Sequence, residues 1–307
     1  MSSQKRVRIC FCVSVAVMLI ALVMALSGTG INFGIDSAGS LNIRYDMGGE
    51  FAQADVEAVL KDRGIAEYSI ARTGENGEFL RVRMPKPADE EAGKALQDGL
   101  QAALLAKFPA MNTEETKVSD VSPVKGVGAV GDVVICVVAL CVLVLAYVGL
   151  RFGLSYGLTV LIGVLHDVLL VISLMVILRG MIPVGNAFGA IVLAVAVYSA
   201  MNTYMLLSSI RTNRKEQGSG KMLPAEVAEL ASKQNRVRTI HTALVMLLVT
   251  TALCVLGTAE VRAIGLPVVL GILISIYSTN LMNGQVWACL EEKYKSRKKT
   301  KAKAKKA

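Results

Sequence analysis

Six long apolar runs divide the chain. They cover residues 7–27, 131–150, 154–178, 184–209, 239–257 and 264–290. About 20 helical residues cross a hydrocarbon core, and lipid offers no partner to backbone polar groups, so each run predicts a transmembrane helix. The pattern therefore predicts a polytopic α-helical membrane protein with six spans. A cleaved signal peptide is the alternative for the first run, because Ala25-Leu26-Ser27 loosely resembles a cleavage site.

The segment between the first two runs has a different pattern. Strands are predicted at residues 41–45, 68–71, 79–83 and 116–121, and helices at 51–63 and 89–108. The order β-α-β-β-α-β is typical of a small α+β, ferredoxin-like domain. We therefore divide the chain into residues 1–27 (N-terminus and first span), 28–129 (external domain), 130–290 (five-helix membrane bundle) and 291–307 (basic tail).

The distribution of charge predicts an orientation. Lys and Arg precede the first run, fill the segment between the fourth and fifth runs, and dominate the tail. By the positive-inside rule, we expect both termini in the cytoplasm and residues 28–129 outside a bacterial plasma (inner) membrane. The tail carries nine Lys or Arg between residues 293 and 306. We expect it to lack regular structure and to attract anionic lipids rather than nucleic acid.

Composition argues against metal, cofactor and enzyme chemistry. The chain is 53% hydrophobic and 5% aromatic, as expected of helices in lipid. All six Cys lie in apolar runs and outside the external domain, so no disulfide framework or metal site is predicted and no cofactor is expected. His166 and Asp167 are adjacent, so on a helix they point about 100° apart. A simple catalytic dyad is therefore not predicted.

Polar residues inside the runs are costly in lipid and mark candidate functional positions. The candidates for ion coupling are Asp167, His166, Asn202, Arg238 and His241. A further polar stripe at helical spacing contains Tyr198, Ser199, Tyr277 and Asn280. We expect these stripes to face one another, with Asp167 protonated, paired with Arg238 or His241, or open to an internal water channel. The alternatives are helix-to-helix hydrogen bonding for the stripe and interfacial snorkelling for Arg238.

Short motifs along the chain resemble one known family. They are Gly34-Ile35-Asp36 with Gly39, Leu150-Arg151-Phe152, Leu165-His166-Asp167-Val168, Tyr198-Ser199-Ala200-Met201-Asn202-Thr203, Arg238-Thr239-Ile240-His241-Thr242 and Tyr277-Ser278-Thr279. Their order and their places on the predicted spans are similar to those of the SecF family, whose members are relatives of the resistance-nodulation-division transporters. The resemblance covers nearly the whole chain.

The resemblance implies a role in protein export. It implies a heterodimer with SecD, association with the SecYEG channel and YidC, unfolded exported polypeptides as cargo, and use of the proton-motive force. The family's fourth-span Asp and fifth-span Arg, implicated in proton conduction, correspond to Asn202 and Arg238. An amide does not release a proton near neutral pH, so the resemblance predicts altered or weakened coupling. The alternative function is half of a related exporter of small molecules or lipids.

Overall fold

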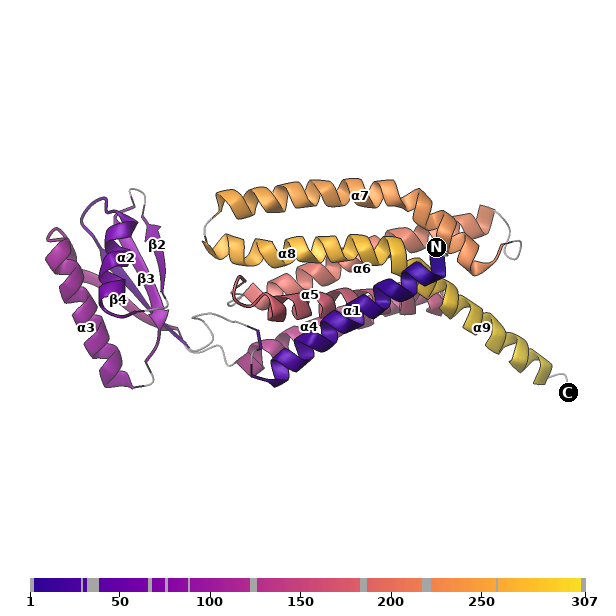
Figure 1. Ribbon diagram of the computed structural model, residues 1–307, viewed down its shortest axis with the longest axis horizontal. Helices are drawn as coiled ribbons and strands as arrows, with labels where there is room; N and C mark the ends of the chain where they lie inside the picture. The colour runs from indigo at the N-terminus through magenta and orange to yellow at the C-terminus, as the bar shows by residue number, and fades with distance from the viewer. Residues whose placement is uncertain are drawn as a thin grey trace. The chain divides into compact units, whose positions relative to one another are not determined.

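The computed structural model describes most of the chain in two compact units. The described residues are 3–28, 30–31, 39–65, 68–74, 77–87, 89–121, 126–182, 187–216, 222–257 and 259–304. One unit comprises Met1–Asn32 with Val130–Ala307, and the other Phe33–Ala129. Figure 1 shows both units with most of their helices and strands labelled. The motif Gly34-Ile35-Asp36 lies outside the described residues.

The smaller unit is a four-stranded antiparallel sheet with two helices. Its elements are β1 (Ser40–Asp46), α2 (Gln53–Asp62), β2 (Ser69–Thr73), β3 (Phe79–Pro85), α3 (Glu90–Lys107) and β4 (Asn112–Val121). The strand order is β2-β3-β1-β4, and every neighbouring pair is antiparallel. This arrangement confirms the predicted ferredoxin-like α+β unit.

One apolar core holds this unit together. Alternate residues of β1 and β3, such as Ile43 and Val82, pack with Leu60 of α2 and Leu104 of α3. The period of two places these strand residues on one face of the sheet. At the start of α3, Asp89 accepts a hydrogen bond from the backbone N–H of Glu91 at 3.3 Å, as an N-cap residue does.

The larger unit is a helical bundle. Its elements are α1 (Ser3–Leu26), α4 (Gly126–Phe152), α5 (Leu154–Ile177), α6 (Phe188–Glu216), α7 (Pro224–Leu256), α8 (Ala259–Tyr277), the π-helical segment η3 (Ser278–Asn283) and α9 (Gly284–Ala304). Six stretches are long and apolar enough to cross a membrane: Val7–Leu26, Gly131–Phe152, Leu154–Ile177, Phe188–Glu216, Pro224–Leu256 and Val261–Ser296. The chain is therefore a multi-pass membrane protein, and the six predicted spans are confirmed.

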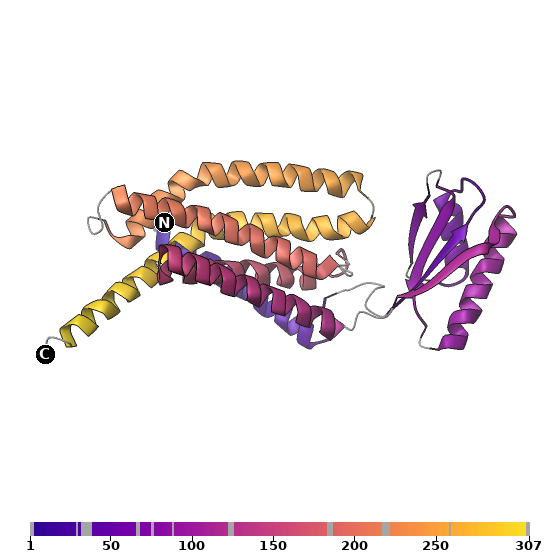
Figure 2. The same ribbon diagram turned by 180° about the vertical axis from the view of Figure 1, so that it is seen from behind.

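Burial differs strongly among the spans. α5 and α6 are the most buried, whereas α1, α4 and α7 leave most of their apolar side chains exposed. Figures 1 and 2 show the bundle from opposite sides, with α5 and α6 between α4 and α8. Small residues allow close helix contact at the centre. A Cβ on Gly271 of α8 would lie 2.4 Å from the Val195 side chain of α6.

Three segments are more helical than the sequence predicted. α6 continues past residue 209 to Glu216, and α7 begins at Pro224 instead of residue 239. Pro224 suits a first helical position, and the Glu226 carboxylate accepts a hydrogen bond from the Leu223 N–H at 3.0 Å, which starts α7 early. The tail, for which we expected no regular structure, is helical as far as Ala304.

Candidate functional site

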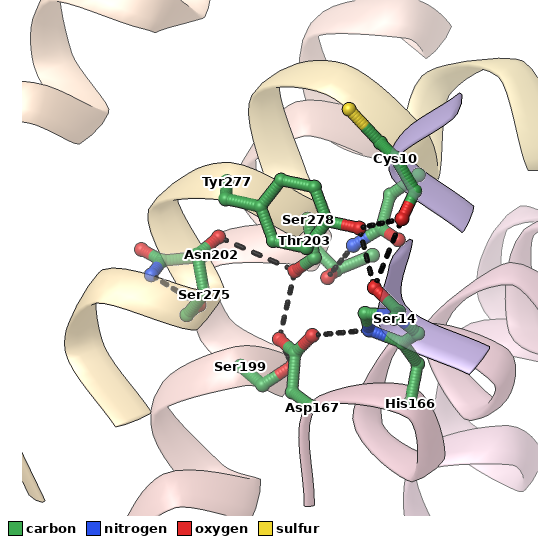
Figure 3. Close-up of polar contacts among 11 residues, drawn as sticks. Cys10, Ser14, His166, Asp167, Ser199, Asn202, Thr203, Ser275, Tyr277 and Ser278 are labelled. Atoms are coloured by element: carbon green, nitrogen blue, oxygen red, sulfur yellow. Dashed lines mark hydrogen bonds and ion pairs between the residues drawn. The ribbon is translucent and has the colours of Figure 1, made fainter. Parts of the chain in front are cut away.

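A buried carboxylate lies at the centre of the bundle. Asp167 is near the middle of α5 and has no exposed surface. Its Oδ2 accepts hydrogen bonds from the hydroxyls of Ser199 at 2.6 Å and Ser278 at 2.8 Å. Its Oδ1 lies 3.0 Å from Nδ1 of His166. Side chains from α5, α6 and η3 therefore converge on one carboxylate, as Figure 3 shows.

His166 and Asp167 are in contact although they are neighbours in sequence. Their expected separation of about 100° around the helix does not prevent a contact of 3.0 Å between Nδ1 and Oδ1. Nδ1 and the short Asp carboxylate both stay close to the backbone of α5, so their side chains meet beside the helix. The other ring nitrogen of His166, Nε2, is buried and has no hydrogen-bond partner among the described residues.

A second hydrogen-bonded layer adjoins the carboxylate. Asn202, one turn after Ser199 on α6, is buried and donates to the hydroxyl of Ser275 on α8 at 2.9 Å. Asn283 of η3 donates to the hydroxyl of Thr203 at 2.8 Å. Figure 3 shows that the amide of Asn202 joins α6 to α8. Asn202 can donate and accept hydrogen bonds there without carrying a proton.

The π-helical segment positions these side chains. π-helical turns inside α-helices are rare and occur frequently at functional sites. Here the segment directly follows Tyr277 and begins with Ser278, which donates to Asp167. Gly163 lets α5 approach it closely, because a Cβ at that position would lie 2.9 Å from Nδ2 of Asn283. This interruption was not predicted, because the segment contains no Gly or Pro that would signal it.

The first span also reaches the cluster. The Tyr277 hydroxyl lies 2.7 Å from the Ser14 hydroxyl of α1 and donates to the Cys10 carbonyl at 3.1 Å. The Tyr277 ring lies 6.0 Å from the His166 ring, centroid to centroid, with an interplanar angle of 51°. A chain of side chains therefore joins α1 to Asp167. The sequence analysis identified Tyr277 but not Ser14.

Two residues of the predicted stripe lie apart from Asp167. The Tyr198 hydroxyl is buried with no hydrogen-bond partner among the described residues. Asn280 donates to the Ile276 carbonyl of its own helix at 2.8 Å. Ser199 and Tyr277 join the Asp167 cluster, so the stripe is split.

Arg238 and His241 do not join the cluster. Both are exposed on α7, and neither side chain has a hydrogen bond or ion pair within the described ranges. The buried face of α7 instead carries Asn235, Thr239 and Ala243, which are spaced four residues apart. Residues 238 and 241 therefore point away from the bundle. Of the three states expected for Asp167, pairing with Arg238 or His241 within this chain is therefore wrong.

A second buried carboxylate was missed. Glu291 of α9 accepts a hydrogen bond from the Ser155 hydroxyl at 2.6 Å and pairs with Arg214 of α6 at 2.9 Å. The guanidinium also donates to the Tyr156 hydroxyl at 3.4 Å and lies 5.6 Å from the Trp287 ring. Glu291 falls one residue past the predicted end of the sixth span, so it was not among the candidate residues.

The two clusters permit different chemistry. A hydroxyl donates to a carboxylate or accepts from a carboxylic acid, so the partners of Asp167 accommodate both protonation states. Among the described residues, no Lys or Arg contacts Asp167 to hold it as an anion. No three His, Cys, Asp or Glu in the described part of the chain gather as metal ligands. The Asp167 cluster is therefore suited to holding a proton.

Sequence comparisons relate the chain to protein export. A family model described as "Protein export membrane protein SecD/SecF, C-terminal" matches residues 101–293, more than half of the chain. Protein translocase subunit SecF of Thermodesulfovibrio yellowstonii is 25% identical over 268 residues, covering 87% of this chain and 86% of that one. SecF of Rickettsia akari is 26% identical over 257 residues, covering 83% and 80%.

Comparison with solved structures agrees with the sequence comparisons. A crystal structure of SecDF in a super-membrane-facing form matches with a TM-score of 0.68 and 22% identity, over 94% of this chain and 39% of that chain. SecDF of Thermus thermophilus, a translocon-associated membrane protein, matches with a TM-score of 0.65 and 22% identity, over 96% and 39%. This chain thus spans less than half the length of SecDF and shares its fold. The motif resemblance is confirmed, and the chain belongs to the SecD/SecF family of protein export membrane proteins.

Proposed function

We propose that this chain is a SecF-type subunit that pairs with a SecD-type partner and aids export of unfolded polypeptides. The family match over residues 101–293 and the SecF relatives of similar length support this role. The complex would lie in the bacterial plasma membrane with both termini of this chain in the cytoplasm, next to the SecYEG channel and YidC. The Lys-rich tail would contact anionic lipids. The relatives give no support to a small-molecule or lipid exporter.

We further propose that Asp167 carries the proton in this subunit. The observation that supports it is a fully buried carboxylate whose partners are two hydroxyls and an imidazole. Asn202 takes the place of the family's acid but cannot exchange a proton, so the titratable group lies instead on α5. Tyr277 and Ser14 connect this position to α1, which gives a change at Asp167 a route to a second helix.

Arg238 and His241 would act, in this proposal, across the partner interface. Both lie on the exposed face of α7, among the apolar side chains Val237, Ile240 and Leu244. A charged side chain facing lipid is costly, whereas a partner's acid or a water-filled interface satisfies it. The predicted coupling of an acid and a base would then be completed between two subunits.

The partnership is tested by co-purification in mild detergent. We expect a SecD-type protein to remain bound to the tagged chain, and the charge-reversing variant Arg238→Glu to weaken its retention. The matched control is Lys215→Glu, an exposed position at the end of α6. Retention that is unchanged by Arg238→Glu would remove α7 from the interface, and absence of any SecD-type protein would contradict the pairing.

The proton proposal is tested by export into inverted membrane vesicles. Vesicles lacking their own SecF would receive this chain with its SecD-type partner, and export would be timed with and without a proton gradient. We expect Asp167→Asn to abolish the acceleration that the gradient gives. Asn202→Asp should leave export intact or strengthen its dependence on the gradient, because it restores the family's acid. Undiminished acceleration in Asp167→Asn, or complete loss of export in Asn202→Asp, would count against the proposal.

A further inference from the structure

A polar cavity lies away from the Asp167 cluster, between α1, α7 and the segment from η3 to α9. It encloses about 140 Å³ and is lined by Val7, Glu229, Ser232, Lys233, Arg236, Asn280, Leu281 and Gln285. About 10–15 Å³ suffices for one water molecule, so the cavity has room for a larger polar group. Neither the motifs nor the export role accounts for it.

The lining is suited to an anion. Lys233 and Arg236 supply positive charge, and the side chains of Ser232, Asn280 and Gln285 supply neutral hydrogen-bond donors. Glu229 is the acid of this lining, and it pairs with Lys233 at 3.1 Å. The Arg236 side chain has no ion-pair partner among the described residues. An arginine without an ion-pair partner therefore lines a donor-rich cavity, and a guanidinium binds phosphate oxygens well.

The depth of the cavity points to a lipid as the source of that phosphate. Val7 is the first residue of the first membrane span, so the cavity borders the end of the apolar zone. On α7 the polar sequence ends near Arg238, and exposed apolar side chains, Ile240 and Leu244, continue from there. A headgroup in the cavity would leave its acyl chains along this apolar surface. Basic pockets between transmembrane helices bind anionic headgroups in this way.

We propose that this cavity binds the phosphate of one anionic phospholipid, in the leaflet that faces the chain termini. Arg236 and Lys233 contact the phosphate oxygens, and Ser232, Asn280 and Gln285 donate to the remaining headgroup oxygens. Because the lining comes from α1, α7 and the region of η3, the bound lipid joins three parts of the bundle. This site is distinct from attraction of lipid by the Lys-rich tail, which needs no cavity.

The test is lipid retention by the full chain in a neutral detergent, counted by native mass spectrometry. The probes are phosphatidylglycerol, phosphatidylcholine and inorganic phosphate. We expect one phosphatidylglycerol to be retained per chain in preference to phosphatidylcholine, with inorganic phosphate displacing it poorly. Lys233→Gln with Arg236→Gln should lower retention about tenfold, since charge-assisted hydrogen bonds are lost. Lys215→Gln, outside the cavity, and a chain ending at residue 296 should retain the lipid.

Three outcomes would overturn the proposal. The first is that the double variant retains as much lipid as the unaltered chain. The second is that the chain ending at residue 296 loses the lipid. The third is that inorganic phosphate displaces the bound lipid as efficiently as phosphatidylglycerol does. The last would identify a free anion in place of a lipid. The thermal midpoint of the double variant is compared with that of the unaltered chain. If the midpoint falls, Gln285→Ala replaces the double variant, because it leaves the charge of the cavity unchanged. We then expect lipid retention to fall about threefold.

Discussion

Two carboxylates are buried in the same helical bundle, and their partners differ. Asp167 is held by two hydroxyls and an imidazole, whereas Glu291 is held by one hydroxyl and the guanidinium of Arg214. Removing a carboxylate from water is costly in both places. At Glu291 the guanidinium of Arg214 compensates, and the pair ties α6 to α9. At Asp167 no Lys or Arg among the described residues does so, which is why we propose that this carboxylate, and not Glu291, carries the proton.

The difference shows that burial of an acid alone does not identify a proton carrier. Both side chains lie in segments long and apolar enough to cross a membrane, and both accept a hydrogen bond of 2.6 Å from a serine hydroxyl. The type of partner separates them. An anion beside an arginine serves stability, whereas an anion beside groups that donate and accept equally well can change its protonation state without leaving a partner unsatisfied.

The largest effect on stability is expected from breaking the ion pair between Glu291 and Arg214. Arg214→Ala leaves a buried carboxylate with one hydroxyl donor, and we expect a loss of about 3 kcal/mol in stability, the low end for a broken buried pair because Arg214 is partly exposed. Thermal unfolding in detergent measures this. Lys215→Ala, the exposed neighbour, should change little. Adding Glu291→Gln to Arg214→Ala should restore part of the lost stability. If the losses of the two single variants simply add in the double variant, the pairing is contradicted.

A smaller effect is expected from removing one hydroxyl at Asp167. Ser199→Ala deletes a hydrogen bond of 2.6 Å to Oδ2 while Ser278 still donates there, and we expect a loss of about 1.5 kcal/mol. The control is Ser209→Ala on the same helix, whose hydroxyl donates to the Met205 carbonyl of its own turn. Urea or thermal unfolding of the two variants gives the comparison. Equal losses would show that the Asp167 hydroxyls have no special role.

The smallest effect on stability is expected from neutralising Asp167 itself. Asp167→Asn keeps the shape: with its amide oxygen at the Oδ2 position it accepts from both hydroxyls, and its NH2 group faces Nδ1 of His166, so we expect a change of at most about 1 kcal/mol. The corresponding change Glu291→Gln should cost about 2 kcal/mol, because it removes the charge that faces Arg214. If Asp167→Asn were the more destabilising of the two, the contrast between a titratable and a structural acid would fail.

The sequence predicted the spans and the small α+β domain well, because each depends on a local pattern. Apolar runs of about 20 residues mark the helices, and alternation marks the strands of the ferredoxin-like unit. The starts of polar helical segments were predicted less well. The first half of α7, beginning at Pro224, has no apolar run and was interpreted as a loop.

The site was predicted only in part, because helical spacing gives the residues that share a face but not the direction of that face. Ser199 and Asn202 are buried and Tyr277 joins the Asp167 cluster, as expected of residues that face the interior. Arg238, for which interfacial snorkelling was the alternative, lies on the exposed face of α7. Ser278 reaches Asp167 from a π-helical turn, whose wider spacing no α-helical pattern predicts. Glu291 was missed because the predicted span ended one residue too early.

Infrared difference spectroscopy between neutral and acidic pH tests the central claim most directly, because a protonated buried carboxyl gives its own C=O stretching band. The membrane-reconstituted chain should show a pH-dependent carboxylic acid band that disappears in Asp167→Asn and persists in Glu291→Gln. A band that persists in Asp167→Asn and disappears in Glu291→Gln would show that the acid paired with Arg214 is the one that takes up the proton.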